Sequence, residues 1–434
     1  MNIDEIIDNI DSNNLNIAFG RVVNISAVTL TAVGLDVAVG DIVRIESVQK
    51  LYTVLGMVTV LNDDMFVIVP FSFIDGFKIN DKVFLQRDGL TIKCGNGLLG
   101  RVVNALGEPI DDLGKIRDLD INAPINKESM SPLDRGIIDQ KFATGVKAID
   151  SMLTCGKGQK VGIFAGSGVG KSTLMGMIVQ GCEATIKVIA LVGERGREIP
   201  EFIHYNLNNN LENTVIVTAT SDESPLMRKY AAFTAMSIAE YFRDKGHDVL
   251  LMMDSVTRFA MAQREIGLST GEPPVSRGYP PSVFALLPQL MERAGNSKKG
   301  SITAFFTVLV DGDDLNDPIA DQSRSILDGH IVLTRDLTEQ GFYPPINILK
   351  SASRVIDKVV TKEHYNDFLK LKRVLSLIKE NEVLIRVGAY KKGMDLELDS
   401  AIAKKEKARE FLTQGTLEKY SFDEIVANLR KVLI

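Results

Sequence analysis

The sequence has no tryptophan, and its three cysteines stand far apart along 434 residues. They are Cys94, Cys155 and Cys182. An odd count without a CxxC pair argues against both a zinc ribbon and a secreted disulfide framework. The four histidines lack the spacing of metal ligands. We therefore expect a chain that works in the cytoplasm and has no histidine-based metal site.

Long apolar runs and an excess of positive charge are also missing. The longest apolar runs, such as 65–74, are interrupted and fall well short of the roughly 18 residues that span a bilayer. Four acidic residues precede the first lysine or arginine, the reverse of a secretory signal. The net charge is −6. We therefore expect neither an integral membrane segment nor a nucleic-acid partner.

What the sequence does contain is an ordinary globular composition, with 45% apolar and 24% charged residues. Residues 1–15 place isoleucines at positions 3, 6, 7 and 10, the spacing of an amphipathic helix. The polar face of this helix is acidic, which favours a protein regulator as its partner over an anionic membrane. Folding back on its own domain is an equally good interpretation.

Three further regions differ in their secondary-structure signals. Residues 16–92 carry short β-rich segments between turns, which predicts a small antiparallel barrel or sandwich; the segments are 20–25, 42–45, 53–60, 66–69 and 82–85. Residues 93–356 alternate apolar strands with helices, which predicts an α/β domain around a parallel sheet. Residues 357–434 predict a helical C-terminal domain. The strands expected in the central sheet are 161–164, 188–192, 215–218, 249–253, 302–309 and 331–334. The expected C-terminal helices are 367–379, 399–413 and 423–432.

The strongest chemical signal is a glycine-rich loop between the strand 161–164 and a helix expected at 173–180. Its sequence is Ala165-Gly166-Ser167-Gly168-Val169-Gly170-Lys171-Ser172-Thr173. Glycines let the backbone amides wrap around phosphate oxygens, the lysine reaches the β- and γ-phosphates, and the serine hydroxyl can ligate Mg²⁺. Ala165 stands where the usual pattern has glycine. The loop still predicts an ATP site, with Mg²⁺ as its cofactor.

Acidic residues end two of the other predicted strands. Asp254 follows the strand 249–253, where a P-loop enzyme holds Mg²⁺ through its water shell. Glu194 follows the strand 188–192 and could activate the attacking water. Arg195, its neighbour, could hold that carboxylate or the phosphate. By composition alone, residues 193–198 are more typical of a solvated run of charges.

Two further candidates lie towards the end of the α/β region. Tyr343 precedes two prolines and could stack on adenine, although an isolated tyrosine is more often a core residue. Arg354 could be an arginine finger supplied to a neighbouring subunit, or an ordinary salt-bridged arginine. The acidic loop 311–317 departs from the EF-hand pattern at positions 5, 6 and 12, so we do not expect calcium.

With these residues in place, the chain resembles the hexameric ATPases related to the catalytic subunit of the rotary ATP synthases. The resemblance covers nearly the whole length through 100–107, 144–150, 280–288 and 344–353. Within this superfamily it is most similar to the flagellum-specific ATPases of the type III export apparatus. The similarity lies in the amino-acid sequences of its P-loop and of residues 310–314 and 326–333. A synthase catalytic subunit has an acidic tip where this chain has Lys404, Lys405, Lys407 and Arg409.

The resemblance implies a β-barrel crown, a RecA-like ATPase core and a helical C-terminal ring, assembled as a homohexamer. It also implies residue roles. Lys171 and Glu194 are the catalytic pair, with Arg195 beside them; Ser172 and Asp254 serve Mg²⁺; Arg354 acts across a subunit interface; and Tyr343 carries adenine. A regulator binds the N-terminal segment, and a coiled-coil stalk and the export gate meet the C-terminal side. Export substrates and chaperones are further partners, at the cytoplasmic face of the inner membrane.

Three alternatives stay open from sequence. A virulence-type injectisome ATPase shares all of this chemistry. A Rho-like nucleic-acid motor needs an aromatic, basic platform, and the region 16–92 offers phenylalanines but few arginines. A non-catalytic ring subunit needs a broken P-loop, whereas Gly170, Lys171 and Ser172 are intact.

Overall fold

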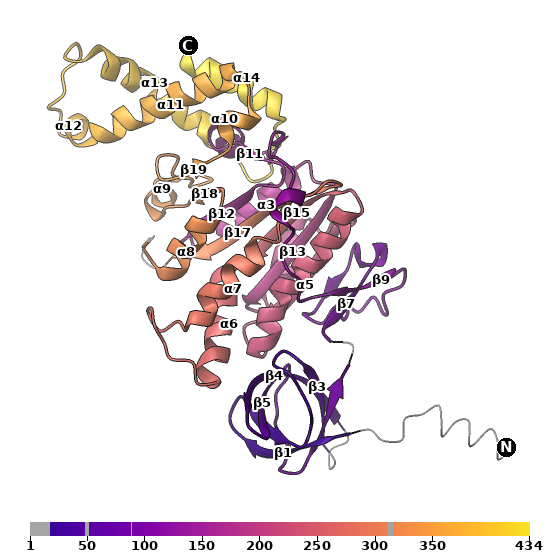
Figure 1. Ribbon diagram of the computed structural model, residues 1–434. Helices are drawn as coiled ribbons and strands as arrows, with labels where there is room; N and C mark the ends of the chain where they lie inside the picture. Colours follow the sequence, from indigo (N-terminus) through magenta and orange to yellow (C-terminus); the bar gives the residue numbers. More distant parts are fainter. Residues whose placement is uncertain (1–17, 48–51, 88, 311–313, 315) are drawn as a thin grey trace, which may run out of the picture. The chain divides into compact units, whose positions relative to one another are not determined.

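The computed structural model describes residues 18–47, 52–87, 89–310, 314 and 316–434 (Figure 1). The helix expected within 1–15 and most of the acidic run 311–315 lie outside these described residues. The chain divides into two compact units. The first joins the N-terminal region to the segments Glu223–Met227 and Ala262–Ser282, and the second contains the rest. The expected boundary between an ATPase domain and a helical domain at residue 356 stays a prediction.

The first unit contains a closed antiparallel barrel in the order β1-β2-β5-β4-β3-β6. Its strands are β1 (Gly20–Ile25), β2 (Leu30–Val33), β3 (Ile42–Ser47), β4 (Tyr52–Asn62), β5 (Met65–Pro70) and β6 (Lys82–Gln86). Alternate residues of β2 (Leu30 and Ala32) and of β5 (Phe66 and Ile68) face a core that also includes Val58. The expectation of a small barrel is confirmed. The strand β2 was missed because it is only four residues long.

The second unit is built on a nine-stranded sheet. Seven strands run parallel in the order β18-β12-β17-β15-β13-β14-β8. Strand β19 pairs antiparallel with β18 at one edge, and β16 pairs antiparallel with the first residues of the central strand β17. The strands are β8 (Val102–Val103), β12 (Lys160–Ala165), β13 (Ile186–Glu194), β14 (Thr214–Thr220), β15 (Asp248–Asp254), β16 (Gly295–Asn296), β17 (Ser301–Leu309), β18 (Gly329–Val332) and β19 (Ala352–Ser353). All six predicted central strands are present. The three that were missed have only two residues each.

Helices, single helical turns and two short pairs of strands precede, separate or follow the strands of this sheet along the chain. The helices are α2 (Lys147–Met152), α3 (Lys171–Gly181), α4 (Glu198–Glu201), α5 (Pro225–Asp244), α6 (Val256–Ser269), α7 (Pro281–Met291), α8 (Pro318–Ile326), α9 (Arg335–Glu339) and α10 (Ile356–Val359), with the single turns η1 (Asn96–Leu98), η2 (Pro132–Asp134) and η3 (Phe202–Asn206). The short strands are β7 (Thr91–Cys94) with β9 (Ile121–Pro124), and β10 (Lys141–Phe142) with β11 (Cys155–Gly156).

Four helices follow the sheet: α11 (Lys362–Glu380), α12 (Glu382–Arg386), α13 (Leu396–Leu412) and α14 (Phe422–Leu433). The three predicted C-terminal helices are therefore present, and α12 is an additional short one (Figure 1). The hydrophobic core that covers α3 continues into α11, α13 and α14 through Phe368, Phe411 and Leu429. No helix in the described ranges combines the length and apolar character needed to cross a bilayer.

The parallel arrangement brings several strand ends to one edge of the sheet. Ala165 at the end of β12 pairs with Leu309 on β17, and Leu191 on β13 pairs with Asp254 at the end of β15. In open parallel sheets, ligands bind at this carboxyl edge. The residues expected to bind and hydrolyse ATP are therefore presented by adjacent strands.

Candidate active site

The glycine-rich loop joins the fully buried strand β12 to helix α3. Gly168 and Gly170 have φ angles of 77° and 91°, a left-handed conformation that favours glycine. Helix α3 begins at Lys171 without a side-chain cap. Its first amides therefore point towards the loop, where the helix dipole favours an anion. The strand–loop–helix context expected of a P-loop is present.

A cluster of buried charges faces this loop from three strands and a helix. The Lys171 ammonium contacts Asp254 Oδ1 and lies 3.6 Å from Glu194 Oε1. Thr307 on β17 donates a hydrogen bond from Oγ1 to Asp254 Oδ1 at 2.7 Å. The lysine and the two carboxylate side chains are each less than 15% exposed. The site thus concentrates opposite charges where little water screens them.

Helix α6 supplies a further cation to the cluster. Arg258 Nε lies 3.4 Å from Glu194 Oε1, but without the geometry of a hydrogen bond. Both atoms are buried and lack a hydrogen-bond partner within the described part of the chain. Unpaired buried polar atoms of this kind are typical of sites that a ligand or water completes. Sequence reasoning missed Arg258 because only the tertiary packing of α6 brings it to Glu194.

Burial controls the ionisation of this cluster. It raises the pKa of Glu194 to about 7, and the effect of Asp254 adds to this rise while Lys171 and Arg258 oppose it. Burial lowers the pKa of Lys171, but the charges of Asp254 and Glu194 outweigh it, so the net direction is upward. Lys171 is therefore charged at neutral pH. Glu194 can gain or lose a proton near neutral pH.

A bulge in β13 directs Glu194 into the cleft. The pairing of β13 with β14 shifts register between Val192 and Glu194, and Gly193 between them has a φ of 68°. A Cβ atom at Gly193 would lie 2.9 Å from Arg258 Cδ. Glycine at this position therefore lets the arginine side chain lie across the strand end and reach the carboxylate.

Arg195 does not hold the carboxylate of Glu194, contrary to one of its two expected roles. Its side chain is 66% exposed and lies 3.9 Å from Glu198. Successive side chains at the end of an extended strand point in opposite directions, so the neighbour of Glu194 in sequence turns away from it. Arg258 occupies that place instead. Arg195 still lines the cleft, and its part in catalysis stays a prediction.

The loop and the charged cluster enclose a cleft of about 560 Å³, a size within the range of small-molecule sites. Of the expected site residues, the cleft is lined by Gly166, Ser167, Gly168, Gly170, Lys171, Ser172, Thr173, Glu194, Arg195 and Asp254. The turn η3 adds Tyr205 and Asn206. Asn206 Nδ2 donates to the backbone carbonyl of Ser172 at 3.0 Å, which ties η3 to the first turn of α3. Ala165 and Val169 are buried beneath the loop.

The residues present suit Mg²⁺. The hydroxyl of Ser172 is exposed at the start of α3, and the carboxylate of Asp254 ends β15 in the same cleft. The buried Glu194 Oε1 has no hydrogen-bond partner among the described residues. Hydroxyl and carboxylate oxygens are the ligands that Mg²⁺ takes, and its other positions are usually filled by water and phosphate.

Tyr343 lies beside the P-loop and presents an exposed ring. A Cβ atom at Gly170 would be 3.9 Å from Tyr343 Cε1, and the tyrosine is 42% exposed. Tyr343 is therefore not a core residue. Its position near the loop is compatible with contact to the base of a nucleotide.

Arg354 lies at the opposite end of the strands from its own P-loop. Val161, at the start of β12, pairs with Gly329 on β18, and Gly329 pairs with Ser353 on β19. The P-loop instead follows the far end of β12. Arg354 is exposed, and within the described ranges its side chain has a hydrogen bond to the Arg324 carbonyl at 3.3 Å but no ion pair. The salt-bridge alternative has no support here.

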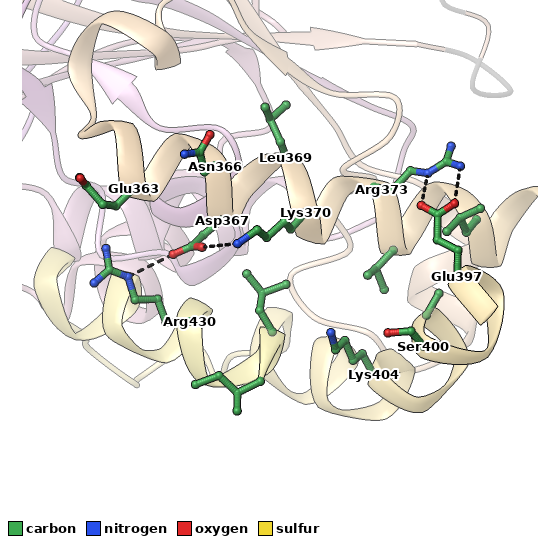
Figure 2. Close-up of a pocket in the computed structure, with 15 residues that line it drawn as sticks. Glu363, Asn366, Asp367, Leu369, Lys370, Arg373, Glu397, Ser400, Lys404 and Arg430 are labelled. Atoms are coloured by element: carbon green, nitrogen blue, oxygen red, sulfur yellow. Dashed lines mark hydrogen bonds and ion pairs between the residues drawn. The ribbon is translucent and has the colours of Figure 1, made fainter.

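A larger groove of about 830 Å³ lies between α11, α13 and α14 (Figure 2). Most of its charged side chains pair with one another. Asp367 lies 3.1 Å from Arg430, and Arg373 binds Glu397 through two hydrogen bonds of 2.9 Å. These ion pairs join the helices that line the groove to one another. The P-loop cleft is therefore the better candidate for catalysis.

Comparison with known families agrees with this geometry. Residues 145–353 match the family described as "ATP synthase alpha/beta family, nucleotide-binding domain", and 360–431 match "T3SS EscN ATPase C-terminal domain". The chain is 57% identical to the "Flagellum-specific ATP synthase" of Helicobacter pylori over 96% of this chain and 95% of the relative. It is 46% identical to the protein of the same name from Bacillus subtilis, over 99% of this chain and 98% of the relative.

Solved structures give the same result. The assembled ATPase EscN from the type III secretion system of enteropathogenic E. coli superposes with a TM-score of 0.91 at 45% identity, covering 96% of this chain and all of that chain. EscN in complex with its central stalk EscO gives a TM-score of 0.89 at 44% identity, with the same coverage.

Proposed function

The chain belongs to the flagellum-specific branch of the ATP synthase alpha/beta family, and on this premise we propose that its P-loop cleft hydrolyses ATP to energise export through the flagellar type III apparatus. The observation that carries the proposal is the buried cluster of Lys171, Glu194 and Asp254 at the carboxyl edge of the sheet. The injectisome alternative rests on the similarity to EscN at 45% identity. The flagellar relative from Helicobacter pylori is more similar, at 57%.

Binding of the triphosphate is assigned to the loop and the start of α3. The amides of residues 166–173 surround the phosphate oxygens, and Lys171 neutralises the charge of the β- and γ-phosphates. Ser172 and Asp254 would hold Mg²⁺, which neutralises the charge that develops on the transferred phosphoryl group. Thr307 fixes Asp254 through its hydrogen bond of 2.7 Å. Asp254 also contacts Lys171 directly.

Glu194 is assigned as the base that activates water. A carboxyl group whose pKa is raised by burial to about 7 can accept a proton from water near neutral pH. Arg258, 3.4 Å away, keeps enough of it ionised and orients it across Gly193. Water then attacks the γ-phosphate, and ADP and phosphate are released.

Replacing Glu194 by glutamine tests this assignment. Glu194→Gln should bind ATP as tightly as the wild type but lose hydrolysis by about a hundredfold or more, because binding does not need the carboxylate and water activation does. Glu201→Gln is the matched control, since Glu201 lines the same cleft and is exposed. Fluorescent nucleotide binding and phosphate release would be measured on both. Equal losses of affinity and rate in Glu194→Gln would exclude the catalytic assignment.

The position of Arg354 supports catalysis across a subunit interface. Because it lies at the other end of β12 from its own loop, it can reach a γ-phosphate only in another copy of the chain. The relative EscN is an assembled ATPase, and we propose a homohexamer in which Arg354 completes the neighbour's site. An arginine of this kind is worth on the order of 10³-fold in rate.

Mixing two inactive chains tests the shared site. Arg354→Ala and Lys171→Ala should each be nearly inactive at every concentration. Mixed rings should regain turnover, because some interfaces pair an intact arginine with an intact P-loop. Phosphate release from the mixture is compared with each variant alone, and assembly is checked by sizing. Mixed rings without added activity would place Arg354 outside the site.

Four further assignments complete the proposal. Tyr343 carries the adenine base, and the segment 1–15 docks a regulator. The C-terminal side, with Lys404, Lys405, Lys407 and Arg409, meets a coiled-coil stalk and the export gate, as EscN meets its stalk EscO. Export substrates and their chaperones are handed over there, at the cytoplasmic face of the inner membrane. Crosslinking from the Lys404 face in intact cells would identify these partners, and crosslinks confined to unrelated proteins would contradict the assignment.

A further inference from the structure

Gln414 is a buried polar residue outside the catalytic cluster. It lies two residues after the end of α13 and is only 3% exposed. Its side chain accepts a hydrogen bond from the backbone amide of Lys147 at 2.8 Å and donates to the carbonyl of Gly145 at 2.9 Å. It also donates to the carbonyl of Glu418 at 3.0 Å. Both ends of the amide are therefore fixed.

Gln414 is hydrogen-bonded to the turn at residues 145–147, and this turn packs against the end of α3, the helix that follows the P-loop. Gly145, with a φ of 72°, packs against Gly181, the last residue of α3. A Cβ atom at Gly145 would lie 3.0 Å from the Gly181 backbone. From inside, the fully buried Asp150 accepts hydrogen bonds from the amides of Thr144 and Gly145 at 2.9 Å. Gln414 is therefore anchored to a rigid turn.

The backbone of Gln414 in turn holds the segment that carries Tyr343. The Gln414 amide donates to the carbonyl of Tyr343 at 2.8 Å. One turn earlier, Arg409 Nη2 donates to the carbonyl of Gln340 at 3.0 Å. The end of α13 thus fixes both ends of the short stretch that presents the tyrosine ring.

The loop after Gln414 lines a second cavity that adjoins the nucleotide cleft. Thr416 and Leu417 line a cavity of about 610 Å³ together with Thr173, Tyr205 and Asn206. The last three residues also line the P-loop cleft. Gln414 therefore stands between two segments: 340–343, which presents the Tyr343 ring beside the P-loop, and 416–417, which lines the adjoining cavity.

We propose that Gln414 is a positioning residue for nucleotide binding: it holds Tyr343 and the loop 416–417 where they meet the base, and it does not touch the phosphates. The inference rests on the proposed function, in which Tyr343 carries adenine. A fixed platform binds a base more tightly than a mobile one, because the ordering cost is met during folding and not during binding. Gln414 should therefore govern the affinity for the nucleoside part and leave the chemistry of the γ-phosphate unchanged.

The test separates base binding from phosphate binding on the purified full-length protein. Gln414→Leu should raise KM for ATP about tenfold and change kcat by less than about twofold. Its inhibition constant for inorganic tripolyphosphate, which has no base, should stay at the wild-type value. Gln414→Glu keeps the acceptor for Lys147 and loses the amide donor, and it should show a smaller rise in KM. Thr413→Val is the matched control, because among the described residues the Thr413 hydroxyl donates only to the carbonyl of Arg409, within the same helix end.

Tyr343→Ala distinguishes failure of this inference from failure of the proposed function. If Gln414 acts through Tyr343, the double variant should have a KM close to that of Tyr343→Ala alone. A raised KM in Tyr343→Ala with a normal KM in Gln414→Leu would overturn the role of Gln414 only. A normal KM in Tyr343→Ala would overturn the adenine platform and this inference with it.

Parallel losses for ATP and tripolyphosphate in Gln414→Leu would show a merely structural residue and would also overturn the inference. Should Gln414→Leu fail to fold, Gln414→Glu decides by the same two readouts.

Discussion

Two clusters of buried charge lie in the same compact unit, and they are built in opposite ways. In the nucleotide cleft, Lys171, Glu194, Asp254 and Arg258 lie close together, yet Glu194 Oε1 and Arg258 Nε have no hydrogen-bond partner among the described residues. In the other cluster, Arg293 is fully buried against Glu240. The first cluster is incomplete and the second is closed.

The closed cluster satisfies almost every donor that the arginine has. Arg293 binds both carboxylate oxygens of Glu240, at 3.1 and 2.8 Å. Its remaining donors reach the carbonyl of Ile125 at 2.8 Å and the hydroxyl of Ser237 at 2.9 Å. These bonds tie α5 to the segment after α7 and to the chain before η2.

The difference separates a structural ion pair from a catalytic one. A buried charge that is fully hydrogen-bonded stabilises a fixed arrangement. Removing one partner leaves the other charge buried without compensation. A cluster with unpaired atoms and a carboxyl pKa raised to about 7 keeps capacity for a ligand, for water and for a proton. Each prediction below would break or sharpen this contrast.

The largest expected effect is on catalysis in the open cluster. Lys171→Ala should lower the rate of hydrolysis by on the order of 10³-fold or more, because the charge that meets the phosphates is lost. Its free energy of unfolding should stay close to the wild-type value, since Glu194, whose pKa burial already raises to about 7, can take up a proton once the cation is gone. Steady-state hydrolysis and denaturant unfolding measure the two quantities. Wild-type hydrolysis in Lys171→Ala would refute the P-loop assignment.

The closed cluster should show the reverse behaviour. Arg293→Met should lower the free energy of unfolding by about 3–5 kcal/mol, because it removes both hydrogen bonds to the buried Glu240 carboxylate and leaves it only the half-exposed Lys127, 3.9 Å away, among the described cations. The fraction that remains folded should hydrolyse ATP at the wild-type rate. Lys298→Met is the control, because Lys298 pairs with Asp134 on the surface and such pairs contribute less than about 1 kcal/mol. Equal stability losses in the two variants would remove the distinction between closed and exposed pairs.

Arg258 should set the pH range of activity. Its positive charge lowers the pKa of Glu194, so Arg258→Gln should raise that pKa. The rise of kcat/KM with pH should then move by about one pH unit towards higher pH. At pH 7 this predicts roughly a five- to sixfold loss that higher pH recovers, because the ionised fraction of Glu194 falls from about one half to about one tenth. Arg258→Lys keeps the charge and should keep the wild-type profile. A profile of Arg258→Gln that falls in height without moving would mean that the arginine acts only through geometry.

The smallest effect concerns the hydroxyl behind Asp254. Thr307→Val removes the hydrogen bond to Asp254 Oδ1 and should raise the Mg²⁺ concentration needed for half-maximal activity about fivefold, the equivalent of about 1 kcal/mol. Thr303 lies on the same face of β17, where its hydroxyl accepts a hydrogen bond from the Gly158 amide at 2.9 Å. Thr303→Val should therefore cost stability and leave the Mg²⁺ requirement alone. An unchanged requirement in Thr307→Val would show that this bond does not position Asp254.

The sequence predicted the parts of the site that depend on local order. β12, the P-loop and α3 are contiguous, and Glu194 and Asp254 end apolar strands, so their place at one edge follows from the parallel sheet. The barrel strands were likewise visible, apart from the four-residue β2. Local signals were enough for these elements.

The parts that were missed depend on packing between segments distant in sequence. Arg258 reaches Glu194 only because α6 lies across the bulge at Gly193. Gln414 comes from beyond α13 and meets a turn 267 residues earlier. Arg195 was favoured because it is adjacent to Glu194 in sequence, but neighbouring side chains at a strand end diverge. No periodicity or motif in a single sequence carries these contacts.

The central claim is that Glu194 is a water-activating base with its ionisation set by burial. The pH dependence of kcat/KM tests it most directly, because that quantity reports ionisation in the free enzyme. We predict that kcat/KM of the wild type rises with pH through a midpoint near 7, where the carboxyl group loses its proton. The residual activity of Glu194→Gln should lack this rise. A rise that persists unchanged in Glu194→Gln, or a wild-type profile that is flat from pH 5.5 to 8.5, would contradict the account.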